Sequence, residues 1–199
     1  MSYTNFGGLH MNKLQAKSKI KSYLKRNFIL FYEDFFDGTE QITMVYKGFK
    51  NSPDNIIESC IYFFSDCMEC RVYYNATGAK FCKESNRQLE LMRLLNFINA
   101  RVWPQGTDFN DSTLYRPSHL YTPRIYMTED GCNDITMTTV VPYEFYEIAT
   151  LETEDFFTAC LPELMDSLSP AVFLLLLDKI NVEQAINIVK IKVLNEEEQ

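Results

Sequence analysis

The sequence is poor in the residues and motifs that enzyme active sites usually need. Its 199 residues include only two histidines, His10 and His119. It contains no G-x-G-x-x-G or G-x-x-x-x-G-K-[ST] phosphate loop, no H-E-x-x-H zinc motif and no G-x-S-x-G nucleophile motif. A Ser or Cys triad needs a histidine base, for which the chain offers little material. We therefore predict a non-enzymatic protein that uses no cofactor.

Long apolar runs are also missing. The longest is Ala171–Leu177, "AVFLLLL", whereas a membrane-spanning helix needs about 20 apolar residues. The first ten residues, "MSYTNFGGLH", contain no apolar segment of the kind found in signal peptides. We therefore expect a cytoplasmic protein, in which the six cysteines are reduced.

Positive charge is scarce over the whole chain, whose net charge is -8 and whose pI is about 4.8. This balance disfavours general nucleic-acid binding, because phosphate backbones need a cationic surface. Near the N-terminus, however, no acidic residue precedes Glu33, and the basic residues are Lys13, Lys17, Lys19, Lys21, Lys25 and Arg26. This basic segment is either an adaptor for nucleic acid or a membrane surface, or a solvated helix face that meets an acidic face of its own or another chain. We favour the second, since few aromatic residues lie between the lysines.

The stretch "SDCMECR" (65–71) contains a C-x-x-C pair, Cys67 and Cys70, with Cys60 before it and Cys82 after it. A redox motif of this type needs its first cysteine to cap a helix, whose N-terminus lowers the pKa of the thiol, but the sequence after Cys70 is typical of a strand. The four cysteines form an alternative structural-zinc set, although only one of the two usual C-x-x-C pairs is present. We favour unligated thiols at a hairpin turn and in the core.

Hydrophobic periodicity predicts alternating helices and strands. A helix is expected over 12–26 with Asn12 as its N-cap, and another over 89–103 after a capping box at Ser85–Gln88. The buried face of the second helix should contain Leu91, Leu94, Leu95, Ile98 and Val102. Strands are expected over 41–49, 56–64 and 69–76, and a hairpin over 124–145 with its turn at 129–131. A long helix should start after Thr153 and be kinked or split by Pro162 and Pro170, before a short helix over 182–190.

This order predicts an α+β fold, in which an antiparallel sheet of hairpins has helices packed on one face. The expected arrangement is helix, three strands, helix, strands, helix. One domain should cover 11–192, with a flexible N-terminus at 1–10 and an acidic tail at 193–199. The segment 104–123 reads as a long loop insertion, because it is polar and aromatic and contains three prolines.

The pattern from about Ile42 to Ala185 resembles the YbjN-like family, whose fold is similar to that of type III secretion chaperones. The resemblance rests on the hairpin "IIESCIYFFSDCMECRVYYNA", on the helix "LELMRLLNFINARVW" with Asn96 and Asn99, and on the hairpin "RIYMTEDGCNDITMTTVV" followed by a long helix and "VEQAI". It implies a small, acidic, cytoplasmic bacterial protein that forms homodimers and binds other polypeptides. The long loop 104–123 and the two helix prolines depart from that pattern.

The candidate binding residues lie in and beside the long loop. They are of types enriched at protein-binding hot spots: Trp103, Phe109, Tyr115, Arg116, His119 and Tyr121. The alternative is that several of them fold back and cover the core. We predict a chaperone-like or regulatory module that binds itself and another protein, by burying apolar side chains against an aromatic sheet face or this loop. The zinc domain and the nucleic-acid or membrane adaptor remain as alternatives.

Overall fold

The computed structural model describes residues 11–102, 105–107, 115–117, 121–129 and 131–196. The first half contains α1 (Lys13–Arg26), β1 (Phe31–Phe36), β2 (Thr39–Lys47), the 3-10 turn η1 (Pro53–Asn55), β3 (Ile56–Phe63), β4 (Cys67–Tyr74), α2 (Ala76–Glu84) and α3 (Gln88–Arg101). The second half contains β5 (Gln105–Thr107), β6 (Tyr115–Pro117), β7 (Arg124–Met127), β8 (Ile135–Pro142), α4 (Tyr143–Ile148), α5 (Thr150–Asp155), the π turn η2 (Phe156–Cys160), α6 (Leu161–Leu176) and α7 (Val182–Lys192). The predicted flexible segment 1–10 lies outside the described residues.

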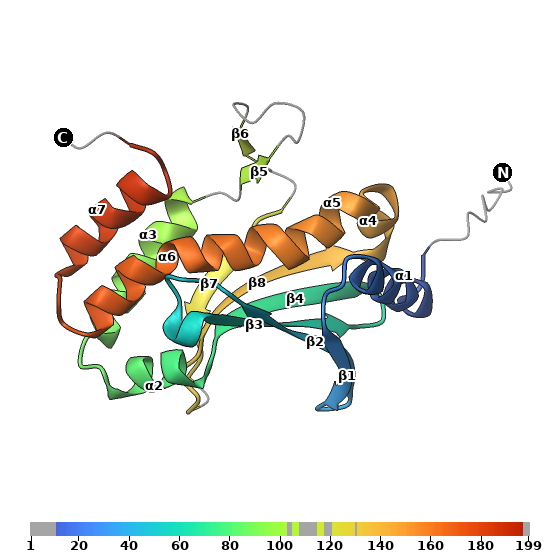
Figure 1. Ribbon diagram of the computed structural model, residues 1–199, viewed down its shortest axis with the longest axis horizontal. Helices are drawn as coiled ribbons and strands as arrows, with labels where there is room; N and C mark the ends of the chain where they lie inside the picture. The colour runs from blue at the N-terminus through green and yellow to red at the C-terminus, as the bar shows by residue number, and fades with distance from the viewer. Residues whose placement is uncertain (1–10, 103–104, 108–114, 118–120, 130, 197–199) are drawn as a thin grey trace, which may run out of the picture.

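The main sheet has the order β1-β2-β3-β4-β8-β7, and every neighbouring pair is antiparallel. The first four strands form successive hairpins, and β8 then pairs with β4 (Figure 1). Strands β5 and β6 form a separate pair. The sequence predicts three strands between the first two helices. The structure has four there, because β1 precedes β2.

Helices cover one face of this sheet, as the sequence predicts. Helix α6 runs across β3 and β4, α4 contacts β8, and α3 contacts β7 (Figure 1). Along β4 the burial alternates strictly, so that Met68, Cys70, Val72 and Tyr74 face the helices and are buried. The fold is therefore the expected α+β arrangement, with a core between the sheet and its single helical layer.

The long helical run from Thr150 to Leu176 differs from the prediction at its start. The helix begins at Thr150, and Thr153 is inside it, where its hydroxyl donates to the carbonyl of Ala149 at 2.7 Å. Thr153 is therefore not an N-cap. The predicted split at the prolines does not occur either, because helical backbone continues through both of them. A π turn precedes Pro162, and in it the N–H of Leu161 donates to the carbonyl five residues earlier.

Helix α2 corrects the expected boundary between strand and helix. Asn75 caps it by accepting a hydrogen bond from the N–H of Gly78 at 3.2 Å. The predicted capping box at Ser85–Gln88 is wrong, because the Ser85 hydroxyl accepts from Arg87 N–H and the Gln88 amide donates to the carbonyl of Cys82. Helix α3 then begins at Gln88. Its expected apolar face is buried as predicted, at Leu91, Leu94, Leu95, Ile98 and Val102.

Within the described residues, one helix is long and apolar enough to pass the length test for a membrane span. It is the run Thr150–Leu176, in which 56% of the most apolar window is buried inside the protein. The sequence alone missed this candidate, since its apolar residues are interrupted by polar ones. In the fold this run lies across the sheet, and its inward side chains form the centre of the core.

Candidate protein-binding surface

The four cysteines of the zinc hypothesis do not come together. Cys67 and Cys70 are three residues apart in β4, so strand alternation sends them to opposite faces of the sheet. Cys60 faces the same side as Cys67, whereas Cys70 and Cys82 are buried on the helix side. The part of the chain that the structure describes contains no group of three potential metal-ligating side chains. The proposed zinc set is therefore wrong, and the stretch "SDCMECR" forms a turn that leads into β4, with Phe64 N–H bonded to Cys67 C=O at 2.9 Å.

The thiols are held in their protonated form. Burial raises the pKa of Cys60 to about 11 and that of Cys82 to about 11, and it raises the pKa of Cys70 as well. Because the thiolate is the reactive species, these residues are poor nucleophiles at neutral pH. Their arrangement supports packing and gives no support to thiol chemistry.

We predict that iodoacetamide at pH 7.5 leaves Cys60, Cys70 and Cys82 unmodified in the folded protein. Cys132 is exposed and should be alkylated first. Peptide mass mapping checks this, and the same reaction in urea, where all thiols should react, serves as the control. Rapid alkylation of Cys70 under native conditions would contradict the burial described here.

The predicted aromatic loop is only partly described. Trp103, Phe109 and His119 lie outside the described residues, and for Tyr115 and Arg116 only the backbone of β6 is described. Tyr121 is 4% exposed. Its hydroxyl is 2.7 Å from that of Thr153, and its ring stacks on Phe156 with centroids 4.3 Å apart. Tyr121 therefore belongs to the core, which is the alternative that the sequence left open.

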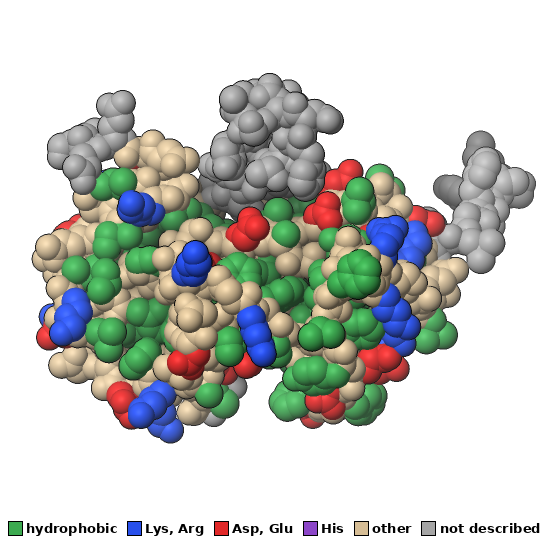
Figure 2. All heavy atoms as spheres, in the orientation of Figure 1, with side chains coloured by type: hydrophobic (Ala, Val, Ile, Leu, Met, Phe, Trp, Pro, Cys, Tyr) green, Lys and Arg blue, Asp and Glu red, His purple; other side chains and the backbone are tan. Residues whose placement is uncertain are grey.

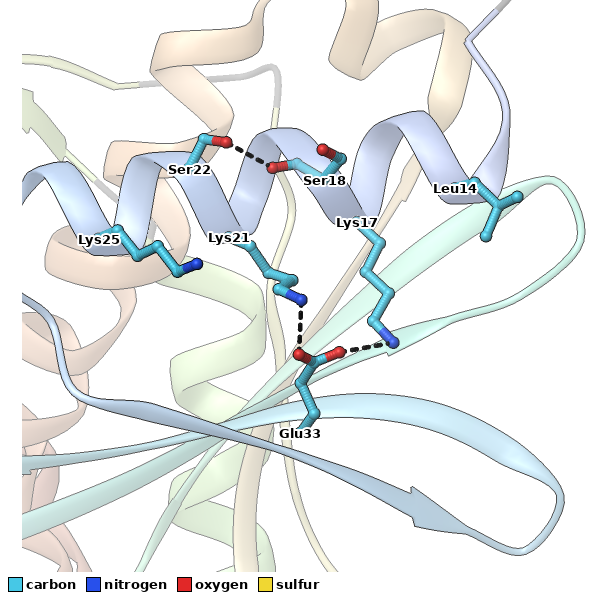
Figure 3. A pocket seen from close by; sticks show the side chains of 7 residues that line it. All are labelled: Leu14, Lys17, Ser18, Lys21, Ser22, Lys25 and Glu33. Atoms are coloured by element: carbon cyan, nitrogen blue, oxygen red, sulfur yellow. Dashed lines mark hydrogen bonds and ion pairs between the residues drawn. The ribbon is translucent and has the colours of Figure 1, made fainter.

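The basic helix α1 meets an acidic face of its own chain. Lys13 pairs with Glu40 at 3.1 Å, and both Lys17 and Lys21 pair with Glu33, at 3.0 and 2.6 Å (Figure 3). Hydrogen bonds from Lys21 and Lys17 lower the pKa of Glu33, and the bond from Lys13 lowers that of Glu40. Much of the N-terminal positive charge is thus used to hold α1 over β1 and β2.

The face of the sheet opposite the helices is covered by no described element. Its outward positions contain an aromatic and aliphatic set: Tyr32, Phe36, Val45, Tyr62, Phe64, Tyr73, Tyr126 and Val140. We call this set the uncovered face. Val140 is 57% exposed, and the rings of Tyr62 and Phe64 stack with centroids 6.3 Å apart.

An ion pair lies at the centre of the uncovered face. The guanidinium of Arg71 donates two hydrogen bonds to Glu69, at 2.8 and 3.2 Å, and the hydroxyl of Thr138 donates a third at 2.8 Å. Burial alone would raise the pKa of Glu69, but the bonds from Arg71 and Thr138 outweigh it and lower that pKa. Arg71 also lies over the ring of Tyr62, 4.7 Å from its centroid. The pair is rigidly held, so an apolar partner can approach without meeting an unpaired charge there.

The two edges of the sheet differ. At the β7 edge, Asn99 of α3 bonds the backbone of Ile125 twice, accepting from its N–H and donating to its C=O, both at 2.8 Å. At the β1 edge, five of the six residues are exposed, and apolar side chains gather around the β1–β2 hairpin, including Phe35 and Phe36 (Figure 2). Sequence reasoning missed this edge, although the run "FILFYEDFFDG" with its Asp-Gly turn was the available signal.

Searches of protein-family models, of curated proteins and of solved structures found no match to this chain. The resemblance to the YbjN-like family therefore stays a prediction from the sequence pattern. The two exposed surfaces, the uncovered face and the β1 edge, are therefore the candidate functional regions.

Proposed function

We propose that the chain is a non-enzymatic, cytoplasmic protein-binding module that acts as a homodimer, in which a second copy covers the uncovered face. The observation that carries this proposal is the set of exposed aromatic and aliphatic side chains on a face that no described element covers. Monomeric proteins rarely leave a large continuous apolar patch in water, and such patches mark interaction sites. Two sheets can bury such faces against each other at about 10 Å separation.

The charges of the uncovered face favour a second copy as its occupant. A two-fold contact places each patch on itself, so the patch has to be self-complementary. Glu58 and Glu69 point outward together with Arg71 and Arg124, which balances the charge. Because the central pair Glu69–Arg71 is satisfied within the chain, two such faces can meet without leaving either of these two charges unpaired. Tyr62, Tyr73 and Val140 would then supply the buried apolar area.

Changing Val140 to lysine tests this proposal. Each copy would then bury an ammonium group in the contact. Its cross-strand neighbour Glu69 is already bonded to Arg71 and Thr138, so the new charge would lack a partner of its own. We expect the dimer dissociation constant, measured by sedimentation velocity, to rise by at least about tenfold. Ile148→Lys is the control, since Ile148 is also an exposed aliphatic residue but lies in α4 on the helix side. A wild-type protein that is monomeric at about 100 µM, or equal effects of both variants, would overturn the proposal.

A further inference from the structure

We propose that the edge of β1, together with the cleft between α1 and β1, binds an extended segment of another protein in which carboxylate side chains alternate with apolar ones. This inference rests on the proposed protein-binding function. Its site is the backbone edge of β1 and the cleft beside it, and it shares Tyr32 and Phe36 with the uncovered face. The mode of binding is strand addition, in which the backbone of the segment pairs with β1 and its side chains give specificity.

The hairpin geometry shows that β1 has backbone groups available for pairing. Its turn consists of Asp37 and Gly38, whose φ angles of 47° and 75° are typical of a type I′ turn. Such a two-residue turn makes Phe36 and Thr39 a hydrogen-bonded pair, and pairing then alternates along the strand. The backbone groups of Phe31, Glu33 and Phe35 therefore point away from β2. In agreement, the N–H of Phe35 donates to the side chain of Asp34.

This edge has few of the devices that usually protect an edge strand: Glu33 points inward, and the side chain of Asp34 accepts the N–H of Phe35. It contains no proline or lysine, and its register with β2 runs without a bulge from Phe31 to Phe36. The β7 edge, by contrast, is closed by Asn99. The one inward charge on β1, Glu33, is neutralised by Lys17 and Lys21. An incoming strand therefore meets an aromatic edge without a bulge, whose inward carboxylate is already paired.

The cleft above this edge selects carboxylates. It has a volume of about 350 Å³ and is lined by Leu14, Lys17, Ser18, Lys21, Lys25 and Glu33 (Figure 3). The three ammonium groups thus meet two carboxylates, because Lys17 lies 3.5 Å from Glu40 as well as 3.0 Å from Glu33. Lys25 forms no ion pair with any described residue. The cleft has a surplus of positive charge over the free edge, which complements an acidic ligand.

The spacing of the lysines fits a strand. Lys17, Lys21 and Lys25 are four residues apart, which is about 6 Å along a helix axis. Alternate side chains of a strand are about 6.6 Å apart. Helix α1 runs along β1 in the opposite sense, since Lys25 lies near Phe31 while Lys21 reaches Glu33. Every second side chain of an added strand would therefore meet one lysine, and the others would lie beside Tyr32 and Phe36.

A second copy fits this edge less well than a different protein does. Antiparallel pairing of two identical edges places the same face of both sheets on the same side. The lysine rows of two α1 helices would then face each other, and their surplus charges would repel. The edge therefore favours an acidic partner, while the uncovered face is left for the second copy.

Fluorescence anisotropy with a labelled peptide of about eight residues, in which glutamate alternates with valine, tests the inference. We expect binding that weakens as salt rises, and no binding of a peptide with lysine in place of glutamate. A third peptide, N-methylated on alternate residues, should also fail, because it cannot donate its backbone hydrogen bonds to β1. Equal binding of the lysine peptide or of the N-methylated peptide would overturn the proposal.

Two charge reversals locate the site. Lys25→Glu should weaken binding of the glutamate peptide about tenfold, whereas Lys50→Glu, also at an exposed lysine but remote from the cleft, should change it less than twofold. Circular dichroism should show both variants folded. The Val140→Lys protein should bind the peptide as well as the wild type does, which separates this site from the dimer contact. Loss of the dimer in Lys25→Glu would assign the edge to a second copy, and absence of peptide binding at about 1 mM would equally overturn the proposal.

Discussion

Gly78→Ala is expected to lower the free energy of unfolding by about 2 kcal/mol or more, although alanine is the better helix former by about 1 kcal/mol. Gly78 is in the first turn of α2 and is buried. A Cβ atom there would lie 2.5 Å from Cβ of Tyr74 and 3.3 Å from the ring of Phe173. Tyr74 cannot easily move away, because its hydroxyl donates to the carbonyl of Met165 at 2.8 Å. The expected strain therefore exceeds the gain in helix propensity.

Thermal and urea unfolding of the variant check this prediction, with a fall in Tm of about 5 °C expected for a chain of this size. Lys80→Ala is the matched control, because Lys80 is exposed in the same helix and should change stability by less than about 0.5 kcal/mol. A Gly78→Ala protein as stable as the wild type would mean that α2 does not pack against Tyr74 and Phe173 as described.

Sequence patterns predicted the elements whose signals are local. Asn12 was recognised as a helix cap, and in the structure its side chain accepts from the N–H of Gln15 at 3.0 Å. The amphipathic face of α3 was equally clear, since its apolar residues recur at helical spacing over many residues. The strands β2, β3 and β4 were identified from alternation and from the turns between them.

Helix α2 was missed because its stability comes from tertiary contacts. The segment "ATGAKFCKE" is short and has a glycine near its start, so its own propensity for a helix is weak. Its position is fixed by Phe81 and Gly78 packing against Phe173, about ninety residues away in the sequence. The one local signal for this helix is Asn75, a residue type that often caps helices. Because the strand pattern of β4 runs up to Tyr74, the sequence pattern assigned Asn75 to the strand instead.

The candidate surfaces were harder to predict than the fold. The alternating pattern of β4 predicts that Met68 and Glu69 lie on opposite faces of the sheet. It does not predict which other strands and helices leave one of these faces uncovered. The composition of the aromatic loop predicts a protein-binding site there. However, Tyr121, the one candidate whose side chain is described, packs in the core. β1 is an edge strand because it lies at one end of the strand order. A local sequence pattern does not reveal the strand order.

Leu175→Asp is expected to abolish the native fold, while Leu174→Asp is expected to be tolerated. Leu175 is fully buried in α6, and Leu174 is 37% exposed. An unpaired carboxylate in the core costs more than about 5 kcal/mol, which is comparable to the whole stability of many domains. At position 174 the carboxylate reaches water, and the expected cost is about 1 kcal/mol. Circular dichroism and urea unfolding of the purified variants measure both effects.

This pair of neighbours also distinguishes a core helix from a membrane span. The run Thr150–Leu176 passes the length and composition test for a span, so its role has to be decided by the environment of its side chains. In a bilayer, an aspartate at either position would lie at nearly the same depth near the end of the span, so the two substitutions would cost a similar amount. In the fold described here, the two costs differ by several kcal/mol, because one side chain faces the sheet and the other faces solvent. Equal losses for Leu174→Asp and Leu175→Asp would therefore contradict the placement of α6 in the core, and with it the uncovered face on the opposite side of the sheet.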